Sequence, residues 1–251
     1  MSSRWEYRWI KKPVSPSPPE TSPIQSEDRN LRIVVLTARQ AEYMSALQDC
    51  QATYSKKLTQ NHPYFALDQN HYQFRITHLG VGPKQANKTL DKISSVLEGD
   101  LLILAGTAGS LKADLSEQTL YIPTAVAHTS DNDWLYPDTQ LLHWIAGILS
   151  ENNESEPSMR MGPLITSPRP VLETDQRNYL LDKTGAMAVD MESSLAIRKF
   201  RHTDGEKGQW LGIRVISDSI DEESESATEK KQLEATEVLN NQLRLIFDQL
   251  N

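Results

Sequence analysis

Residues 31–37 read Leu-Arg-Ile-Val-Val-Leu-Thr, an almost unbroken apolar run with the length of one β-strand. A strand that is apolar on both faces is typical of a parallel sheet covered by helices on both sides, because each face must then be buried. Strand-like and helix-like segments alternate along the rest of the chain. We therefore expect an α/β fold, a three-layer αβα sandwich around a central mixed, largely parallel sheet.

The segments on either side of this first strand define the expected organisation. Besides 31–37, the predicted strands span residues 63–68, 72–79, 101–105, 118–126, 161–166, 186–190 and 210–216. The predicted helices span residues 39–50, 83–97, 138–150 and 191–201, followed by a C-terminal helix with apolar Ala235, Leu239, Leu243, Ile246 and Leu250 on one face. A capping box, Ser226-Ala-Thr-Glu229, is expected to start that last helix.

The first thirty residues have a different composition, with prolines interleaved with serines. Such a segment is typical of an extended linker without a core, so we assign residues 1–30 to an arm and residues 31–251 to one α/β domain. The arm begins with Trp5 and Trp9 and continues with Lys11 and Lys12. It is expected to pack on the body or on a neighbouring subunit, the alternative being an anchor for a partner or a membrane surface.

Composition excludes several classes of function. The chain has 251 residues and a formal net charge of −8, which argues against nucleic-acid binding through a broad basic face. No apolar run approaches the roughly 20 residues of a membrane span, and no secretory signal is recognisable. The single cysteine, Cys50, fits a reducing compartment, and the six histidines lack metal-ligand spacing. We expect a cytoplasmic protein without a metal or an organic cofactor.

Ligands of such sheets bind where strands pass into helices, and this directs attention to the predicted strand ends. The stretches at these ends are Thr37–Glu42, Gly80–Gly82, Gly106–Ser110, Ala188–Ser193 and Arg214–Asp218. They contain four carboxylates, which suit proton transfer or binding of sugar hydroxyls, and glycines whose backbone N–H groups can face an anion. The carboxylates are Glu42, Asp190, Glu192 and Asp218.

Each stretch also has a purely structural interpretation. The glycines from Gly106 to Gly109 could close a tight turn, Glu192 could complement a helix dipole, and Asp218 with Ser217 could cap a turn. The Gly80-Val-Gly82 segment lacks the third glycine of the dinucleotide-binding pattern. Taken singly, none of these stretches identifies an activity.

Taken together and in this order, the stretches resemble one family. Ala188-Val-Asp-Met-Glu-Ser193 and Ile213-Arg-Val-Ile-Ser-Asp218 are the most specific, and Ala105-Gly-Thr-Ala-Gly-Ser-Leu111, Leu120-Tyr-Ile-Pro123 and Gly80-Val-Gly82-Pro accompany them. From about residue 31 onward the chain is similar to the nucleoside phosphorylase and nucleosidase superfamily of the purine and uridine phosphorylase type. It looks most like the methylthioadenosine/S-adenosylhomocysteine nucleosidases and the hopanoid-associated nucleosidase or phosphorylase proteins.

The resemblance implies cleavage of the bond between a purine and ribose in an adenosine-type, possibly 5′-substituted, nucleoside. By matching position, Asp218 is the acid that protonates the purine, a role that requires a proton on this carboxyl near neutral pH. Glu42 is the base that activates water. Glu192 would bind the ribose hydroxyls and Met191 would pack against the sugar. The remaining implied substrate-binding residues are Thr107, Gly106, Gly109, Asp190, Ser217, Pro170 and Val171.

The resemblance is incomplete in two places. Asp190 replaces a glutamate of the classical nucleosidases, and the segment between Pro123 and the helix 138–150 is short. That segment covers the alkylthio end of the substrate in the nucleosidases, so a different 5′ substituent is possible here. Trp134 and Tyr136 could line that end or simply pack.

The second reactant decides between hydrolysis and phosphorolysis. Phosphorylases hold phosphate with arginines, whereas Leu104 and Glu42 occupy two of the corresponding places, and a carboxylate would repel phosphate. Both residues favour water. Arg39 lies near the same turn and would bind phosphate if the chain were a phosphorylase. A catalytically silent nucleoside-binding relative is the non-enzymatic alternative, and the resemblance implies a homo-oligomer.

Overall fold

The computed structural model describes residues 30–49, 54–69, 71–131, 133–151, 158–203, 208–218 and 225–249. Its elements, in chain order, are β1 (Leu31–Thr37), α1 (Ala41–Asp49), β2 (Tyr54–Thr59), β3 (His62–Gln69), β4 (Tyr72–His78), α2 (Pro83–Lys92), β5 (Leu101–Ser110), β6 (Leu120–His128), α3 (Thr139–Glu151), β7 (Met159–Thr166), α4 (Thr174–Thr184), β8 (Ala188–Asp190), α5 (Ser193–Thr203), β9 (Gln209–Asp218) and α6 (Glu225–Gln249).

Strand β1 lies inside the sheet, as its apolar sequence predicts. It pairs in parallel with β4 on one side and with β5 on the other. Ile33, Val34 and Val35 are fully buried, and successive side chains enter opposite cores because side-chain direction alternates along a strand. Burial on both faces therefore explains why this segment carries almost no polar residue.

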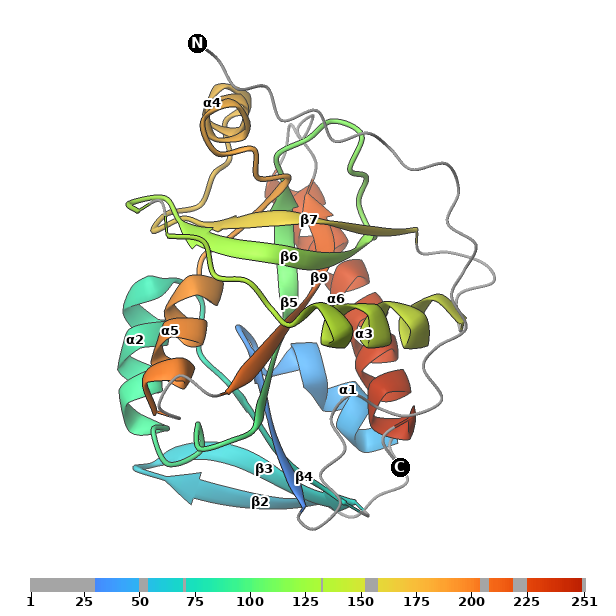
Figure 1. Cartoon of the computed structure of the whole chain (residues 1–251). Helices are drawn as coiled ribbons and strands as arrows, with labels where there is room; N and C mark the ends of the chain where they lie inside the picture. The colour runs from blue at the N-terminus through green and yellow to red at the C-terminus, as the bar shows by residue number, and fades with distance from the viewer. Residues whose placement is uncertain are drawn as a thin grey trace.

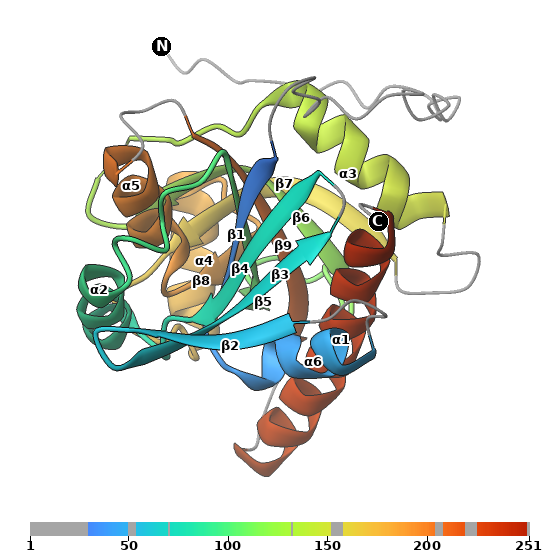
Figure 2. The same ribbon diagram turned by 90° about the horizontal axis from the view of Figure 1, so that it is seen from below.

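Helices cover both faces of the sheet (Figures 1 and 2). Helices α1, α3 and α6 supply apolar side chains to the core on one face, and α2 and α5 supply those of the other. The expected three-layer αβα architecture with a mixed sheet is confirmed. In the described part of the chain, no helix is long and apolar enough to span a membrane.

The sheet curls back on itself, which the sequence did not predict. Its 9 strands follow the order β2-β3-β4-β1-β5-β8-β7-β6-β9, and β9 pairs with β5 in addition to β6. The strands β5, β8, β7, β6 and β9 therefore form a closed ring, and in Figure 1 β6 and β7 run across the direction of β1 and β4. This closure gathers the ends of β5, β7, β8 and β9.

The glycine-containing stretch 106–110 is not the turn that the sequence suggested. Strand β5 continues through it to Ser110, and its pairing with β9 shifts register between Ala108 and Gly109, so that Gly109 lies opposite Asp218. An irregularity of this kind re-aims the strand beyond it. The extended part of β5 pairs with β8, which brings Asp190 close to β5 and β9.

Two elements were missed, and several boundaries differ. Strand β2 and helix α4 had no sequence prediction, and α2 ends at Lys92, short of the predicted 97. Helix α6 begins one residue before the proposed capping box, whose side chains lie outside the described residues. The predicted 1–30 arm, except its last residue, and Cys50 also lie outside them.

Candidate active site

Glu42 is a carboxylate buried beneath the end of β1. It lies in the first turn of α1 and is only 1% exposed. The Arg39 backbone N–H donates a hydrogen bond to its Oε2 atom at 2.8 Å. Burial raises the pKa of Glu42, while the backbone N–H groups of Arg39 and Thr107 and the charges of Arg214 and Arg39 oppose that rise. A buried carboxyl with a raised pKa is suited to accepting a proton.

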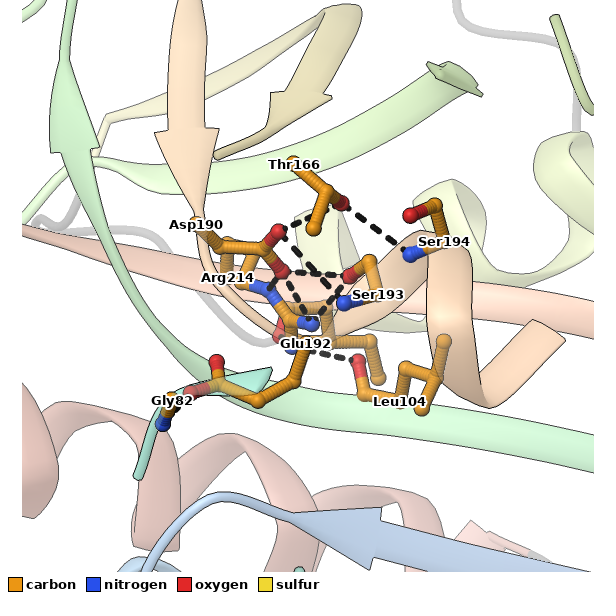
Figure 3. A network of polar contacts seen from close by, with 9 residues as sticks. Gly82, Leu104, Thr166, Asp190, Glu192, Ser193, Ser194 and Arg214 are labelled. Atoms are coloured by element: carbon orange, nitrogen blue, oxygen red, sulfur yellow. Dashed lines mark hydrogen bonds and ion pairs between the residues drawn. The ribbon is translucent and has the colours of Figure 1, made fainter. Parts of the chain in front are cut away.

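Glu192 approaches the same region from the other side, between β8 and α5. The Gly82 N–H, at the start of α2, donates to its Oε1 atom at 2.6 Å. Burial and the neighbouring charges of Asp190 and Glu42 raise the pKa of Glu192 to about 7. Figure 3 shows its side chain directed away from the Asp190 network and toward Gly82. Since the charge of Glu42 contributes to the raised pKa of Glu192, the two carboxyls lie within electrostatic range of each other.

Because Gly106 has no side chain, Glu42 and Arg214 can both lie close to the backbone of β5. A Cβ atom at this position would lie 3.3 Å from Nη1 of Arg214 and 3.7 Å from Oε1 of Glu42. The strand β5 therefore passes close to both charged groups, which a larger residue would push apart. Nη1 of Arg214 also donates to the Leu104 carbonyl at 2.9 Å, so the guanidinium is held against β5.

Asp190 takes part in a closed network rather than facing open space (Figure 3). Its Oδ1 atom accepts from the Thr166 hydroxyl at 2.9 Å. Its Oδ2 atom accepts from the Ser193 hydroxyl at 2.5 Å and from Nη2 of Arg214 at 2.9 Å. The carboxylate is only 2% exposed. Both oxygens of Asp190 therefore have protein partners, one of them Arg214, and the predicted contact of Asp190 with substrate stays a prediction.

Asp218 lies at the end of β9, separated from this network by the Gly109 backbone. Its Oδ2 atom forms an ion pair with Nη2 of Arg177, and its Oδ1 atom accepts from the Ser217 hydroxyl at 3.1 Å. The side chain is 17% exposed. The sequence suggested a buried acid, whereas this carboxyl is partly exposed and lies beside a guanidinium.

The smaller predicted site residues lie around these carboxylates. Met191 packs near Gly82, since a Cβ on that glycine would lie 3.4 Å from its Cε atom. Thr107 is half-buried on β5, and the exposed Arg39 lies at the β1–α1 turn next to Glu42. Because Arg39 is exposed, its guanidinium can contact a ligand that lies beside Glu42.

Pro170 and Val171 are not joined to the carboxylates by any described contact. They line a cavity of about 450 Å³ between the segment after β7 and helix α4. Ser167, Arg169 and Tyr179 lie on the same walls, and none of the four predicted carboxylates does. The sequence therefore placed Pro170 and Val171 correctly after β7, but the structure assigns them to a neighbouring cavity.

Sequence reasoning missed two arginines. Arg214 stands within a quoted motif, yet as a residue of an apolar strand it received no role. Arg177 lies in a helix that was not predicted, although Asp175 in its first turn, Lys183 in its last and Gly185 at its C-cap are ordinary helix-boundary signals. Within the described residues, no cluster of three or more His, Cys, Asp or Glu side chains could hold a metal ion.

Comparison with solved structures identifies similar folds. A 5′-methylthioadenosine/S-adenosyl homocysteine nucleosidase of Helicobacter pylori superimposes with a TM-score of 0.76 at 15% identity, over 88% of this chain and 99% of that chain. The futalosine hydrolase of Helicobacter pylori gives 0.75 at 16%, over 88% and 98%. S-adenosylhomocysteine nucleosidase from Streptococcus pyogenes gives 0.74 at 17%, over 88% and 98%.

Sequence comparison gives the family directly. No curated protein sequence matches the chain. The family profile described as the phosphorylase superfamily matches residues 32–249, which include every carboxylate discussed above. By fold, by the order of its motifs and by this match, the chain belongs to the phosphorylase superfamily.

Proposed function

We propose that this protein hydrolyses the N-glycosidic bond of a purine nucleoside of the adenosine type, releasing free base and sugar. The observation that carries the proposal is a pair of carboxyls with raised pKa values: Glu42, which is buried beside Gly106, and Glu192, which is partly buried and whose pKa is raised in part by the charge of Glu42. Similar folds of nucleosidases and of futalosine hydrolase support the reaction class.

The proposed reaction separates charge in the nucleoside. The bond from C1′ to the purine nitrogen breaks and its electron pair moves to the base, which leaves positive charge on the sugar. Glu42 takes a proton from the attacking water, and Asp218 supplies one to the base. Glu192 binds the ribose hydroxyls, and its negative charge stabilises the developing cation. Atoms balance because one water molecule is divided between the sugar and the base.

Water is the proposed nucleophile because of the charges at the β1–α1 turn. Glu42 is buried in the place where a phosphate dianion would need a cation, and like charges repel. Leu104 supplies only its carbonyl oxygen, which accepts from Arg214. Phosphorolysis stays the second candidate because the exposed Arg39 lies beside Glu42, where it can contact an anion.

The test is product chromatography with methylthioadenosine, S-adenosylhomocysteine, adenosine and inosine, each with and without phosphate. The proposal predicts free base and free sugar in equal amounts in both buffers from at least one adenosine-type substrate. Base release that requires phosphate and yields a sugar phosphate would establish the phosphorylase alternative. Saturable binding of all four nucleosides without cleavage would identify a silent relative and contradict the proposal.

A further inference from the structure

Asn240 is a buried asparagine of α6 that bonds to the backbone of α1. The residue is only 6% exposed. Its Oδ1 atom accepts from the Ala46 N–H at 2.9 Å, and its Nδ2 atom donates to the Ala41 carbonyl at 2.9 Å and to the Thr236 carbonyl of its own helix at 2.9 Å. The acceptor faces an N–H and the two donors face carbonyls, so this amide is matched to its surroundings in one orientation.

The two residues of α1 that Asn240 contacts lie on either side of Glu42. Ala41 is the first residue of α1, Glu42 follows it, and Ala46 lies about one turn further along. An α-helix satisfies its interior N–H groups with its own carbonyls, so α1 does not need the bond to Ala46 in order to form. The bonds to Asn240, which join residues 194 and 199 positions apart, instead fix where α1 lies relative to α6.

Helix α6 connects α1 with the strands that face Glu42. It lies beside α1 in both views (Figures 1 and 2), and it also contacts β5 and β9. Strand β5 carries Thr107, whose backbone N–H bonds to Glu42, and β9 carries Arg214, whose charge acts on Glu42. The position of α1 against α6 therefore determines the position of Glu42 against these two strands.

Apolar packing alone would define this position less sharply. Ala46 and Leu47 of α1 share a core with Leu239 and Leu243 of α6. Burial of apolar surface is non-directional, whereas a hydrogen bond weakens steeply when its distance or angle changes. The amide of Asn240 therefore supplies directional contacts that hold α1 in one register on α6.

We propose that Asn240 is a positioning residue that holds the first turn of α1 on α6 and thereby fixes the Glu42 carboxylate against β5. This inference rests on the proposed function, in which Glu42 takes a proton from the attacking water. Asn240 acts through the backbone of α1 and exchanges no proton. Its contribution is geometric, because a misplacement of about 1 Å can lower the rate of an enzyme about 100-fold.

The first test observes the bond between the Arg39 N–H and Glu42, which is 2.8 Å long, and needs no turnover. Amide hydrogen exchange is measured by NMR in the wild-type chain and in Asn240→Leu, whose side chain branches at the same atom but cannot hydrogen-bond. The proposal predicts faster exchange at Arg39 as well as at Ala46. Unchanged exchange at Arg39 would overturn it, even where Ala46 exchanges faster. If Asn240→Leu does not fold, the smaller substitution Asn240→Ser takes its place.

The second test separates catalysis from binding on the substrate found by chromatography. Asn240→Leu should lower kcat about 10- to 100-fold with little change in KM, because the base is displaced while the groups that bind the nucleoside remain. An unchanged kcat in a variant that has lost stability to urea would show that Asn240 supports only the fold.

The pH dependence of kcat gives an independent measure of where Glu42 lies. The charged groups that face Glu42 are Arg39 before α1, Arg214 of β9 and Glu192 before α5, and Asn240→Leu alters none of them. Burial raises the pKa of Glu42, and the base must be ionised to accept a proton. A less buried Glu42 should therefore move the acid limb of kcat to lower pH. An acid limb at the wild-type pH would contradict the proposal.

Phe247→Leu is the matched control in the same helix. The ring of Phe247 meets that of Phe74 on β4 with centroids 5.3 Å apart, about two turns beyond Asn240. This substitution should also lower stability to urea, yet it should leave exchange at Arg39, kcat and the acid limb as in wild type. Equally fast exchange at Arg39 in both variants would indicate general loosening of α6 and overturn the proposal.

Failure of the proposed function would be recognised separately. If the wild-type chain cleaves no nucleoside, the proposed function fails, while exchange at Arg39 still decides whether Asn240 positions Glu42.

Discussion

Two aspartate–arginine pairs lie near each other, at the ends of β8 and β9, and they differ in what remains free. Asp190 and Arg214 are 2% and 5% exposed, and the aspartate also accepts from Thr166 and Ser193. Asp218 is 17% exposed, and its arginine comes from a helix with no other buried residue. The first carboxylate is fully satisfied by the protein, and the second keeps access to a ligand.

The two aspartate–arginine pairs are therefore expected to serve different purposes. The Asp190 network joins β7, β8, α5 and β9, and it holds Arg214 against strand β5, which the Glu42 side chain of α1 also approaches. Such a network fixes geometry because every polar atom has a partner. The Asp218–Arg177 pair joins the ends of β5 and β9 to helix α4, and its carboxylate is partly exposed to solvent. We therefore expect the first pair to control stability and the second to control the reaction.

The largest effect should come from Asp218→Asn. Loss of a proton-transferring group lowers catalysis by about 10²- to 10⁴-fold, and this is the expected fall in kcat for base release. Unfolding by urea should change by only about 1 to 3 kcal/mol. The reason is that the Asp218 side chain is 17% exposed, so water can approach the pair when its charge is removed, whereas Asp190 is 2% exposed. A variant that keeps its turnover would remove Asp218 from the chemistry.

Asp190→Asn, the same substitution in the other pair, should lower the free energy of unfolding rather than the turnover rate. Asp190→Asn leaves the buried Arg214 charge without its counter-charge, which costs about 3 to 5 kcal/mol of unfolding free energy. The measurement is urea unfolding of both Asn variants side by side. If Asp190→Asn proves as stable as Asp218→Asn, the two pairs do not differ in the way described here.

A pH-dependent effect is expected at Glu192. Burial raises its pKa in the folded chain from the ordinary 4.5 to about 7, so the folded state binds this proton more tightly than the unfolded state. The stability that this proton contributes is present below pH 4.5 and is lost as the pH rises through 7, by at most about 3 kcal/mol. Glu192→Gln should lack this loss, whereas the exposed Glu98→Gln should retain it. Thermal unfolding of the three chains at pH 5 and pH 8 measures the difference, and parallel curves for wild type and Glu192→Gln would contradict it.

The smallest effect should follow from Thr166→Val. This change removes one hydrogen bond to Asp190 and one from the Ser194 N–H, but it leaves the Arg214 charge paired. We expect a loss of about 1 to 2 kcal/mol in urea unfolding and little change in turnover. A loss as large as that of Asp190→Asn would mean that the hydroxyl, rather than the charge pair, organises the network.

The sequence predicted the layers of the fold well because their signal is local. The apolar run of β1 requires burial on both sides, and that requirement holds whatever the rest of the chain does. For the glycines after Leu104, the local pattern led to a wrong prediction. They suggested a turn, yet pairing with β9 and β8 extends β5 through them to Ser110. Strand register depends on distant partners, which a local pattern does not contain.

Some features of the candidate site could likewise be predicted from the sequence, and others could not. The carboxylates could be picked out as acids at predicted strand ends. The sequence could not show whether an acid is free or already paired, because the partners lie far away in the chain. Arg214 is 24 residues from Asp190, and Arg177 is 41 residues from Asp218. The sequence therefore located the chemistry but did not distinguish the satisfied aspartate from the available one.

The most direct test of the account is the initial rate of base release measured against phosphate concentration, starting from none. Water activated by Glu42 requires no phosphate, so the rate should be constant across the series and should be lost in Glu42→Gln. A rate that starts at zero, saturates with phosphate and disappears in Arg39→Leu would contradict the account and identify a phosphorylase.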